Sequence, residues 1–319
     1  FGEIAREEFN TLCSQIQLTS RHKLKFAKSP SGIAFIRVLD IVAEGYTLDI
    51  SSEGVVVKAS DDHGLFYALQ TLKQLLPVDF FGKGSPDKRM WTLPYCHIED
   101  HPQFSYRGMH LDCARHMFSV AELKKYLDMM ALLKMNHFHW HLTDDQGWRI
   151  EVSSFPKLME TSAWRSGTQI GMDRSSSDGV KYGGYYTKEQ IREIVSYASK
   201  YGIEVIPEID LPGHMVSVLA AYPEFGCTGG PYDVWTHWGI SPDVLCAGNP
   251  AVYEFLEKVI DEVAELFPCE YFHIGGDECP KIRWEVCPKC QQKIRELKFE
   301  ADSRATAEQR LQNYFMSRV

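Results

Sequence analysis

The sequence has no block of Lys and Arg residues, and its 319 residues carry a formal net charge of −9. Nucleic acid is therefore not expected as a partner, because its recognition depends on cationic side chains that neutralise phosphates. No apolar run reaches the roughly 18 residues that a membrane span needs, and no charged-then-apolar leader follows Phe1. Nine cysteines are too sparse for a disulfide scaffold. Hydrophobic residues make up 44% and charged residues 24%, so we expect a packed core.

Two regions with different patterns divide the chain. Residues 1–100 contain alternating or apolar stretches and then a helical pattern, so we expect a small α+β domain there. Its strands are expected at residues 33–39, 46–50 and 54–58, its helix at residues 61–76, and the connector at residues 93–102. Residues 101–319 repeat a strand and then a helix, which predicts parallel strands joined by right-handed crossovers.

Four strand–helix units are expected in this second region. The strands are expected at residues 107–111, 138–142, 204–209 and 271–274. Capping patterns predict helices that begin at Ser119, Thr187 and Asn249, and a last helix is expected over residues 302–319. The fold class is therefore α/β, and four units are half of the eight that close a barrel.

Two adjacent carboxylates follow the fourth expected strand, in the run HIGGDE from His273 to Glu278. Glycine lets backbone and ligand approach closely, because it has no side chain. The carboxyl ends of buried strands are where α/β barrels keep their chemistry. Asp277 and Glu278 therefore indicate acid/base work on a polar substrate, with a solvated turn as the alternative.

Histidines alternate along the second expected strand. His137, His139 and His141 share one face, since alternate residues of a strand point the same way. They indicate either a metal site or a polar layer that lines a barrel interior. The residues that would complete a metal site follow the third strand: Glu208, Asp210 and His214. The polar layer is favoured, because a catalytic metal needs further ligands and an open position.

Arginines and cysteines add two further signals. Arg107 begins the first expected strand, and Arg115 follows its end. Guanidinium groups suit sugar hydroxyls or carboxylates, with a structural ion pair to Asp112 or Glu208 as the alternative. Cys287 and Cys290 form a CxxC pattern, which is weak evidence for zinc because no second CxxC or His pair follows nearby. We expect a local disulfide or free thiols there, and neither a metal nor a cofactor.

Four motifs follow one another along the chain: Tyr106-Arg107-Gly108 with Leu111-Asp112, the run from His139 to Asp145, the run from Asp210 to His214, and the run from His273 to Glu278. In this order they resemble the motifs of glycoside hydrolase family 20, the β-N-acetylhexosaminidases, in the bacterial branch with a Cys-Pro-x-Cys loop. The resemblance covers nearly all of the chain. It implies a (β/α)8 TIM barrel preceded by a small α+β domain, with about the first four βα units present in residues 101–319.

The resemblance also implies an activity and roles for five residues. The activity is retaining exo-hydrolysis of terminal non-reducing β-linked N-acetylhexosamine, in which the substrate's own acetamido group attacks and forms an oxazolinium intermediate. Glu278 would be the general acid and base, and Asp277 would orient the acetamido group. Arg107 would hold sugar hydroxyls. Asp144 and His214 would support Glu278 through hydrogen bonds.

The expected partner is a glycan or chitooligosaccharide, and the expected location is periplasmic or extracellular. One alternative is a metal-dependent amide hydrolase that uses His139, His141 and His214. Another is a non-catalytic glycan-binding protein, which is disfavoured because Asp277 and Glu278 are both present. Because half a barrel leaves sheet edges unpaired, we expect residues 1–319 alone to be unstable and inactive.

Overall fold

The computed structural model describes residues 2–20, 32–82 and 91–319, and the chain divides into two compact units. Unit 1 consists of Phe1–Met109, Lys124–His137 and Ser196–Glu204. Unit 2 consists of His110–Leu123, Phe138–Val195 and Val205–Val319. Within the described ranges, no helix combines the length and the hydropathy that crossing a bilayer demands.

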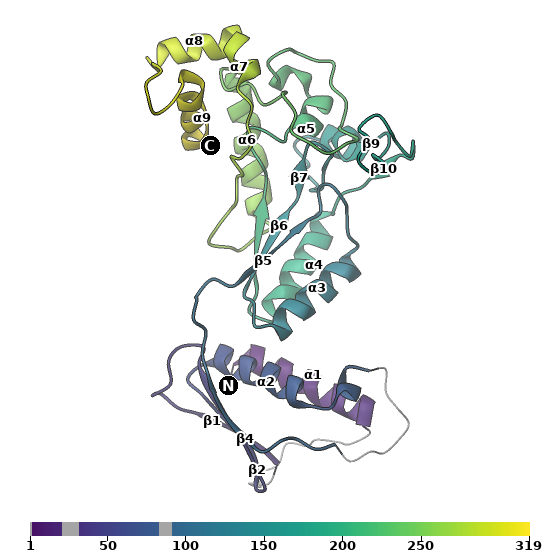
Figure 1. Cartoon of the computed structure of the whole chain (residues 1–319), viewed down its shortest axis with the longest axis vertical. Helices are drawn as coiled ribbons and strands as arrows, with labels where there is room; N and C mark the ends of the chain where they lie inside the picture. The colour runs from purple at the N-terminus through teal and green to yellow at the C-terminus, as the bar shows by residue number, and fades with distance from the viewer. Residues whose placement is uncertain (1, 21–31, 83–90) are drawn as a thin grey trace. The chain divides into compact units, whose positions relative to one another are not determined.

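Unit 1 contains a four-stranded sheet in the order β1-β3-β2-β4 (Figure 1). The strands are β1 Gly32–Arg37, β2 Tyr46–Ser51, β3 Gly54–Ala59 and β4 Cys96–Asp100. β1 pairs with β3 in parallel, whereas β2 pairs with both β3 and β4 antiparallel. Every second side chain of β2 and β3 is buried, so the alternating pattern that predicted these strands reflects one covered face.

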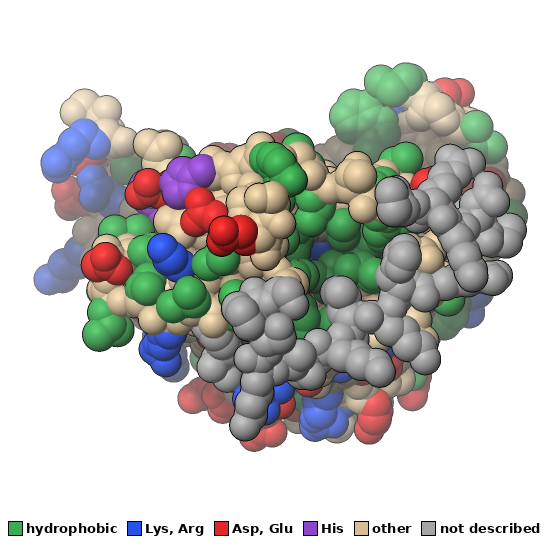
Figure 2. All heavy atoms as spheres, turned by 90° about the horizontal axis from the view of Figure 1, so that it is seen from below, with side chains coloured by type: hydrophobic (Ala, Val, Ile, Leu, Met, Phe, Trp, Pro, Cys, Tyr) green, Lys and Arg blue, Asp and Glu red, His purple; other side chains and the backbone are tan. Residues whose placement is uncertain are grey.

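Two helices, α1 Glu3–Ser20 and α2 Asp62–Leu75, lie side by side along this sheet. Phe9 of α1 meets Phe35 of β1 with ring centroids 5.1 Å apart. Asp61 caps α2 by accepting a hydrogen bond from the backbone N–H of Gly64 at 2.8 Å, and the short helix η1 Val78–Phe81 follows. Figure 2 shows hydrophobic side chains gathered in a hollow of the face that it draws.

The expectation for residues 93–102 as a connector is wrong, because Cys96–Asp100 form strand β4 and pair with β2. None of the side chains of β4 is fully buried. An edge strand of this kind carries little of the apolar alternation by which a strand is found in a sequence. The other strands and the helix expected in this region are confirmed to within two residues.

A second sheet has the order β11-β6-β5 and carries the strand ends from which the candidate site is built. Its strands are β5 Gly108–Asp112, β6 His137–His141 and β11 Glu204–Glu208. The helices that follow in the chain are α3 Val120–Leu132, α4 Lys188–Ser199, α5 Val216–Ala221, α6 Pro250–Ala264, α7 Ile282–Val286, α8 Pro288–Glu296 and α9 Ala307–Arg318. The shorter elements are β7 Thr143–Asp144, β8 Gly147–Trp148, η2 Leu158–Ser162, β9 Trp164–Arg165, β10 Tyr182–Gly183 and η3 Pro223–Phe225.

The predicted helix starts are confirmed by their hydrogen bonds. Glu122 accepts from the backbone N–H of Ser119 at 2.8 Å, and Gln190 accepts from that of Thr187 at 3.0 Å. Asn249 caps α6 with Pro250 at its first position. The last helix begins later than expected, because a capping box at Thr306 starts α9.

The fourth expected strand, residues 271–274, is reduced in the described chain to one parallel bridge between Glu208 and His273. The backbone N–H groups of Ile209 and Leu211 still donate to the carbonyls of His273 and Ile274, at 3.1 and 3.2 Å. Pairing then stops, because Gly275 and Gly276 take φ values of 63° and 110° and turn the chain. Asp277 and Glu278 therefore lie on a loop that directly follows the segment paired with the end of β11.

Candidate functional site

The two faces of β6 have different surroundings. Phe138 and Trp140 are fully buried in the apolar core, whereas His139 and His141 both contact Glu208 at the end of β11. Their ring nitrogens donate to the same carboxylate oxygen at 2.6 and 2.7 Å. Burial alone would raise the pKa of Glu208, but these hydrogen bonds hold it well below its usual range. His137 instead pairs with Glu204 within unit 1, at 3.3 Å.

Asp144 is fully buried and lies among three cationic groups. Its Oδ2 atom lies 3.0 Å from Nε2 of His141 and 2.8 Å from the guanidinium of Arg115, and its Oδ1 atom lies 3.3 Å from Nδ1 of His214. Burial would raise the pKa of Asp144, but hydrogen bonds from the two histidines and the charge of Arg115 lower it to about 2. Asp144 is therefore ionised near neutral pH.

His214 joins Asp144 to the acid loop, which we define as residues 275–287. Burial would lower its pKa, but the hydrogen bond and the charge of Asp144 raise it to about 9. The second ring nitrogen, Nε2, lies 3.6 Å from Oε2 of Glu278, whose side chain is 52% exposed. Asp144, His214 and Glu278 thus form a line from the buried interior to the surface.

The backbone is strained where this line ends. His214 has φ of 55° and Glu278 has φ of 43°, in the left-handed region that costs a non-glycine residue roughly 1–3 kcal/mol and is frequent at functional sites. Gly275 has no room for a side chain, since a Cβ atom there would lie 1.7 Å from Oδ1 of Asp210. Asp210 also accepts a hydrogen bond from the backbone N–H of Gly276 at 3.2 Å, which fixes the turn before the two carboxylates.

A pocket of about 450 Å³ opens beside Glu278. Its lining residues are Asp112, Arg115, Gln146, Arg174, Trp238, Gly239, Ile240 and Glu278. The volume lies within the range of about 300–1,000 Å³ that is usual for small-molecule sites. Carboxylates, guanidinium groups and one indole therefore meet around a space that suits a polar ligand.

Arg115 is held in this wall by Asp112 and Asp144, at 2.9 and 2.8 Å. Asp112 also accepts hydrogen bonds from the backbone N–H groups of Ala114 and Arg115, at 2.9 and 3.0 Å, so one carboxylate fixes the whole turn. The short spacing from Asp112 to Arg115 just beyond a strand is a sequence signal for this group. The resemblance implied the sugar-binding role for Arg107 and not for Arg115.

Arg107 belongs to unit 1, and its guanidinium is fully engaged there. It donates to the hydroxyl of Tyr67 at 2.6 Å, to Glu44 at 3.2 Å and to the carbonyl of Lys134 at 2.8 Å. Arg107 therefore makes a structural ion pair, but with Glu44 and not with the expected Asp112 or Glu208. Four of the five expected site residues, Asp144, His214, Asp277 and Glu278, belong to unit 2.

The contacts do not support one metal site that uses His139, His141 and His214. The first two bind Glu208 and the third binds Asp144. Within the described residues, the possible metal-binding groups that contain histidine place His139 and His214 in separate clusters. The polar layer favoured from the sequence agrees with this arrangement.

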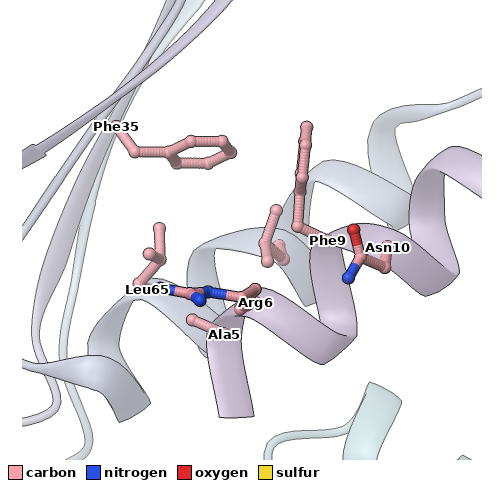
Figure 3. Close-up of a pocket in the computed structure, with 7 residues that line it drawn as sticks. Ala5, Arg6, Phe9, Asn10, Phe35 and Leu65 are labelled. Carbon is pink, nitrogen blue, oxygen red and sulfur yellow. The ribbon is translucent and has the colours of Figure 1, made fainter. Parts of the chain in front are cut away.

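A second pocket, of about 390 Å³, lies within unit 1 between α1, α2 and β1 (Figure 3). Phe9, Phe35 and Leu65 face it, together with Arg6 and Asn10. Its lining contains no carboxylate, so it offers no acid/base pair. This pocket therefore differs from the one beside Glu278, whose lining includes the carboxylates of Asp112 and Glu278.

Comparison with known proteins gives family matches to both regions of the chain. A model described as "Glycosyl hydrolase family 20, catalytic domain" matches residues 104–319, and one described as "Glycosyl hydrolase family 20, domain 2" matches residues 4–101. A "Beta-hexosaminidase" of Porphyromonas gingivalis is 45% identical over 301 residues, which cover 93% of this chain and 37% of that protein. A "Beta-hexosaminidase" of Vibrio furnissii is 41% identical over 247 residues, covering 77% of this chain and 39% of that protein.

A solved structure gives the same result for the fold. The "GH20 Exo beta-N-Acetylglucosaminidase from Vibrio harveyi in complex with N-acetylglucosamine" has a TM-score of 0.81 at 33% identity and covers 100% of this chain and 48% of that chain. The neighbours imply an α/β domain of the TIM-barrel type preceded by a small domain. This chain spans less than half the length of these relatives.

We expect the buried histidines to make stability depend on pH. Glu208 and Asp144 raise the pKa of His141 to about 10 despite its burial. Its stabilising contribution is therefore complete below its unfolded pKa of about 6.5 and is lost as the pH rises towards the folded value. The free energy of unfolding of the full-length protein should fall by on the order of 3 kcal/mol over this range, measured by urea denaturation.

The matched variants are His141→Gln and, as a control, His101→Gln at an exposed position. The first should flatten the pH dependence, and the second should leave it unchanged. Identical pH slopes for His141→Gln and the wild-type protein would contradict this assignment of charge.

Proposed function

The chain belongs to glycoside hydrolase family 20, and we propose that the whole protein is a retaining exo-β-N-acetylhexosaminidase. Its substrate is a glycan or chitooligosaccharide with a terminal non-reducing β-linked N-acetylhexosamine. The observation that carries this proposal is the line from Asp144 through His214 to Glu278, which ends beside the pocket at Arg115. The buried anion Asp144, the charged imidazole of His214 and the half-exposed acid Glu278 lie one after another in space. Such an arrangement suits general acid–base catalysis.

Glu278 protonates the leaving oxygen and then, as the carboxylate, activates water. Its exposure lets it reach a ligand, while Nε2 of His214 lies 3.6 Å from one of its oxygens on the interior side. A protonated His214 stabilises the carboxylate that forms when Glu278 gives up its proton. The strained φ of Glu278 agrees with a loop backbone that fixes the direction of this side chain.

Asp277 orients the substrate's acetamido group and balances the positive charge of the oxazolinium intermediate. It immediately precedes Glu278 in the chain, and it shares a cluster with Asp210 and His214. Burial, with the charges of Asp277 and other neighbouring acids, raises the pKa of Asp210 to about 7. Since the acetamido oxygen is the nucleophile, the reaction needs no second carboxylate to attack the sugar carbon.

Arg115, rather than Arg107, binds hydroxyl groups of the terminal sugar. Its guanidinium lines the pocket with Glu278 and is oriented by two carboxylates. The planar donor fork leaves further N–H groups for a ligand. Arg107 in turn stabilises unit 1.

Residues 101–319 supply about the first four βα units of the catalytic barrel, and residues 1–100 are the small domain before it. The less-than-half coverage of the relatives supports this division of the whole protein. We place the protein in a bacterial periplasm or outside the cell, because polymeric glycans are met there.

Glu278→Gln should lower kcat of the full-length protein by about 100-fold, since general acid–base catalysis contributes about 10²–10⁴-fold. The assay is release of nitrophenol from nitrophenyl β-N-acetylglucosaminide. Glu285→Gln, an exposed neighbour in α7 that loses the same charge, should retain full activity. Equal rates for wild type and Glu278→Gln would refute the role of Glu278, and glycan binding without turnover would favour a non-catalytic protein.

Two arginine variants distinguish an arginine that binds the substrate from one that stabilises the fold. Arg115→Ala should raise KM at least tenfold, because a desolvated charged hydrogen bond is worth about 1.5–3 kcal/mol. Arg107→Ala should leave KM within about twofold, by the same reasoning that its donors serve protein partners, and should lower the melting temperature instead. A KM effect confined to Arg107→Ala would return the sugar-binding role to that residue.

A further inference from the structure

We propose that Cys227, Cys246, Cys287 and Cys290 bind one zinc ion in a closed structural site within unit 2. The Sγ atoms of all four lie within 4.8 Å of one another. Cys246 Sγ lies 3.7 Å from the Sγ atoms of both Cys287 and Cys290, and Cys227 Sγ lies 3.9 Å from that of Cys290. The cluster contains only cysteines, and it includes the CxxC pair that was expected to form a disulfide or to remain as free thiols.

The distances match a metal tetrahedron. With a Zn–S bond of about 2.3 Å, the sulfur atoms at neighbouring corners of a tetrahedron lie about 3.8 Å apart. A disulfide would bring two of them to about 2.05 Å, and none of the nine cysteines of the chain is in one. The spacing therefore fits four ligands around one ion.

The ligands come from two segments that are distant in the sequence. Cys287 is the residue before α8, and Cys290 lies in its first turn, in the C-x2-C spacing that zinc sites use. Cys227 and Cys246 both belong to the β11 loop, which we define as residues 209–249. This pair is not recognisable as a second CxxC, because 18 residues separate its members. A bridge between Gly226 and Leu245 brings them together in the fold.

Gly248 allows the two segments to approach. A Cβ atom at this position would lie 2.2 Å from the backbone carbonyl carbon of Lys289. Only glycine therefore permits the chain after Cys246 to contact the start of α8. The indole N–H of Trp284 donates to the carbonyl of Leu245 at 2.9 Å, which holds the same two segments from the other side.

The chemistry of the cluster favours zinc over other occupants. Thiols give only weak hydrogen bonds, and four thiolates repel one another unless a cation lies between them. Soft sulfur ligands in a tetrahedron select zinc or iron and disfavour magnesium or calcium. Four protein ligands leave no open position, so the ion holds structure and does not contact substrate.

The ion would link the β11 loop to the acid loop, and these two loops carry the candidate catalytic residues. The β11 loop contains His214, and the backbone N–H of Leu245, next to Cys246, donates to the carbonyl of Pro212 at 2.9 Å. The acid loop contains Glu278 and runs directly to Cys287. A metal shared by both loops therefore maintains the distance between His214 and Glu278. The zinc site does not depend on the proposed hexosaminidase function. The effect of the zinc on turnover does rest on that function.

The test begins with the metal content of the full-length protein, purified without a polyhistidine tag and without added metal. Elemental analysis should find about one zinc ion per chain in the wild type and in Cys96→Ser, whose cysteine lies on β4. Cys290→Ser should contain less than a tenth of that zinc and melt at least roughly 5 °C lower. Equal zinc in wild type and Cys290→Ser would overturn the proposal.

A second measurement needs no variant and so covers a failure of Cys290→Ser to fold. Replacement of the bound metal by cobalt(II) should produce the strong visible and near-ultraviolet bands of a tetrahedral cobalt–thiolate site. In the untreated protein, four additional thiols should react with a thiol reagent after a chelator is added. Iron in place of zinc, disulfides among the four cysteines, or four reactive thiols without metal would each refute the zinc site. One zinc per chain without hexosaminidase turnover would refute the proposed function alone.

Discussion

A carboxylate with no exposed surface holds the candidate site together. Asp144 is ionised because His141, His214 and Arg115 surround it, and their hydrogen bonds and charges outweigh the cost of burial. These partners come from β6, from the β11 loop and from the turn after β5. One buried anion therefore brings three separate parts of the chain to a common point. If the anion were removed, His214 would lose its hydrogen-bond partner, whereas His141 and Arg115 would keep Glu208 and Asp112. Removing one partner of a buried charge pair is the costly case for buried charges.

The loops that complete the site are fixed by contacts of a different kind. Gly275 gives room to Asp210, which holds the turn in front of Asp277 and Glu278. Farther along, the acid loop meets the β11 loop at the cluster of four cysteines. Electrostatics thus sets the inner end of the line from Asp144 to Glu278, and backbone geometry with the proposed metal sets its outer end.

Much of this could be predicted from the sequence, because strand alternation, helix caps and the adjacent carboxylates are local patterns. Strand β4 could not, since its polar edge position carries no apolar alternation. The contacts of Arg107 could not be predicted either, because its match to a motif does not reveal that Tyr67 and Glu44 accept hydrogen bonds from its guanidinium. The cysteine cluster escaped prediction because its halves are joined only by tertiary folding.

The most direct test of this account is the charge of His214 in the folded full-length protein. Nuclear magnetic resonance of histidine labelled at the ring nitrogens, with His214 identified by its loss in His214→Gln, reports that charge as a function of pH. His214 should be an imidazolium at neutral pH and should titrate near pH 9. A neutral ring at that pH, titrating near the ordinary value of 6.5, would contradict the buried anion on which the site is built.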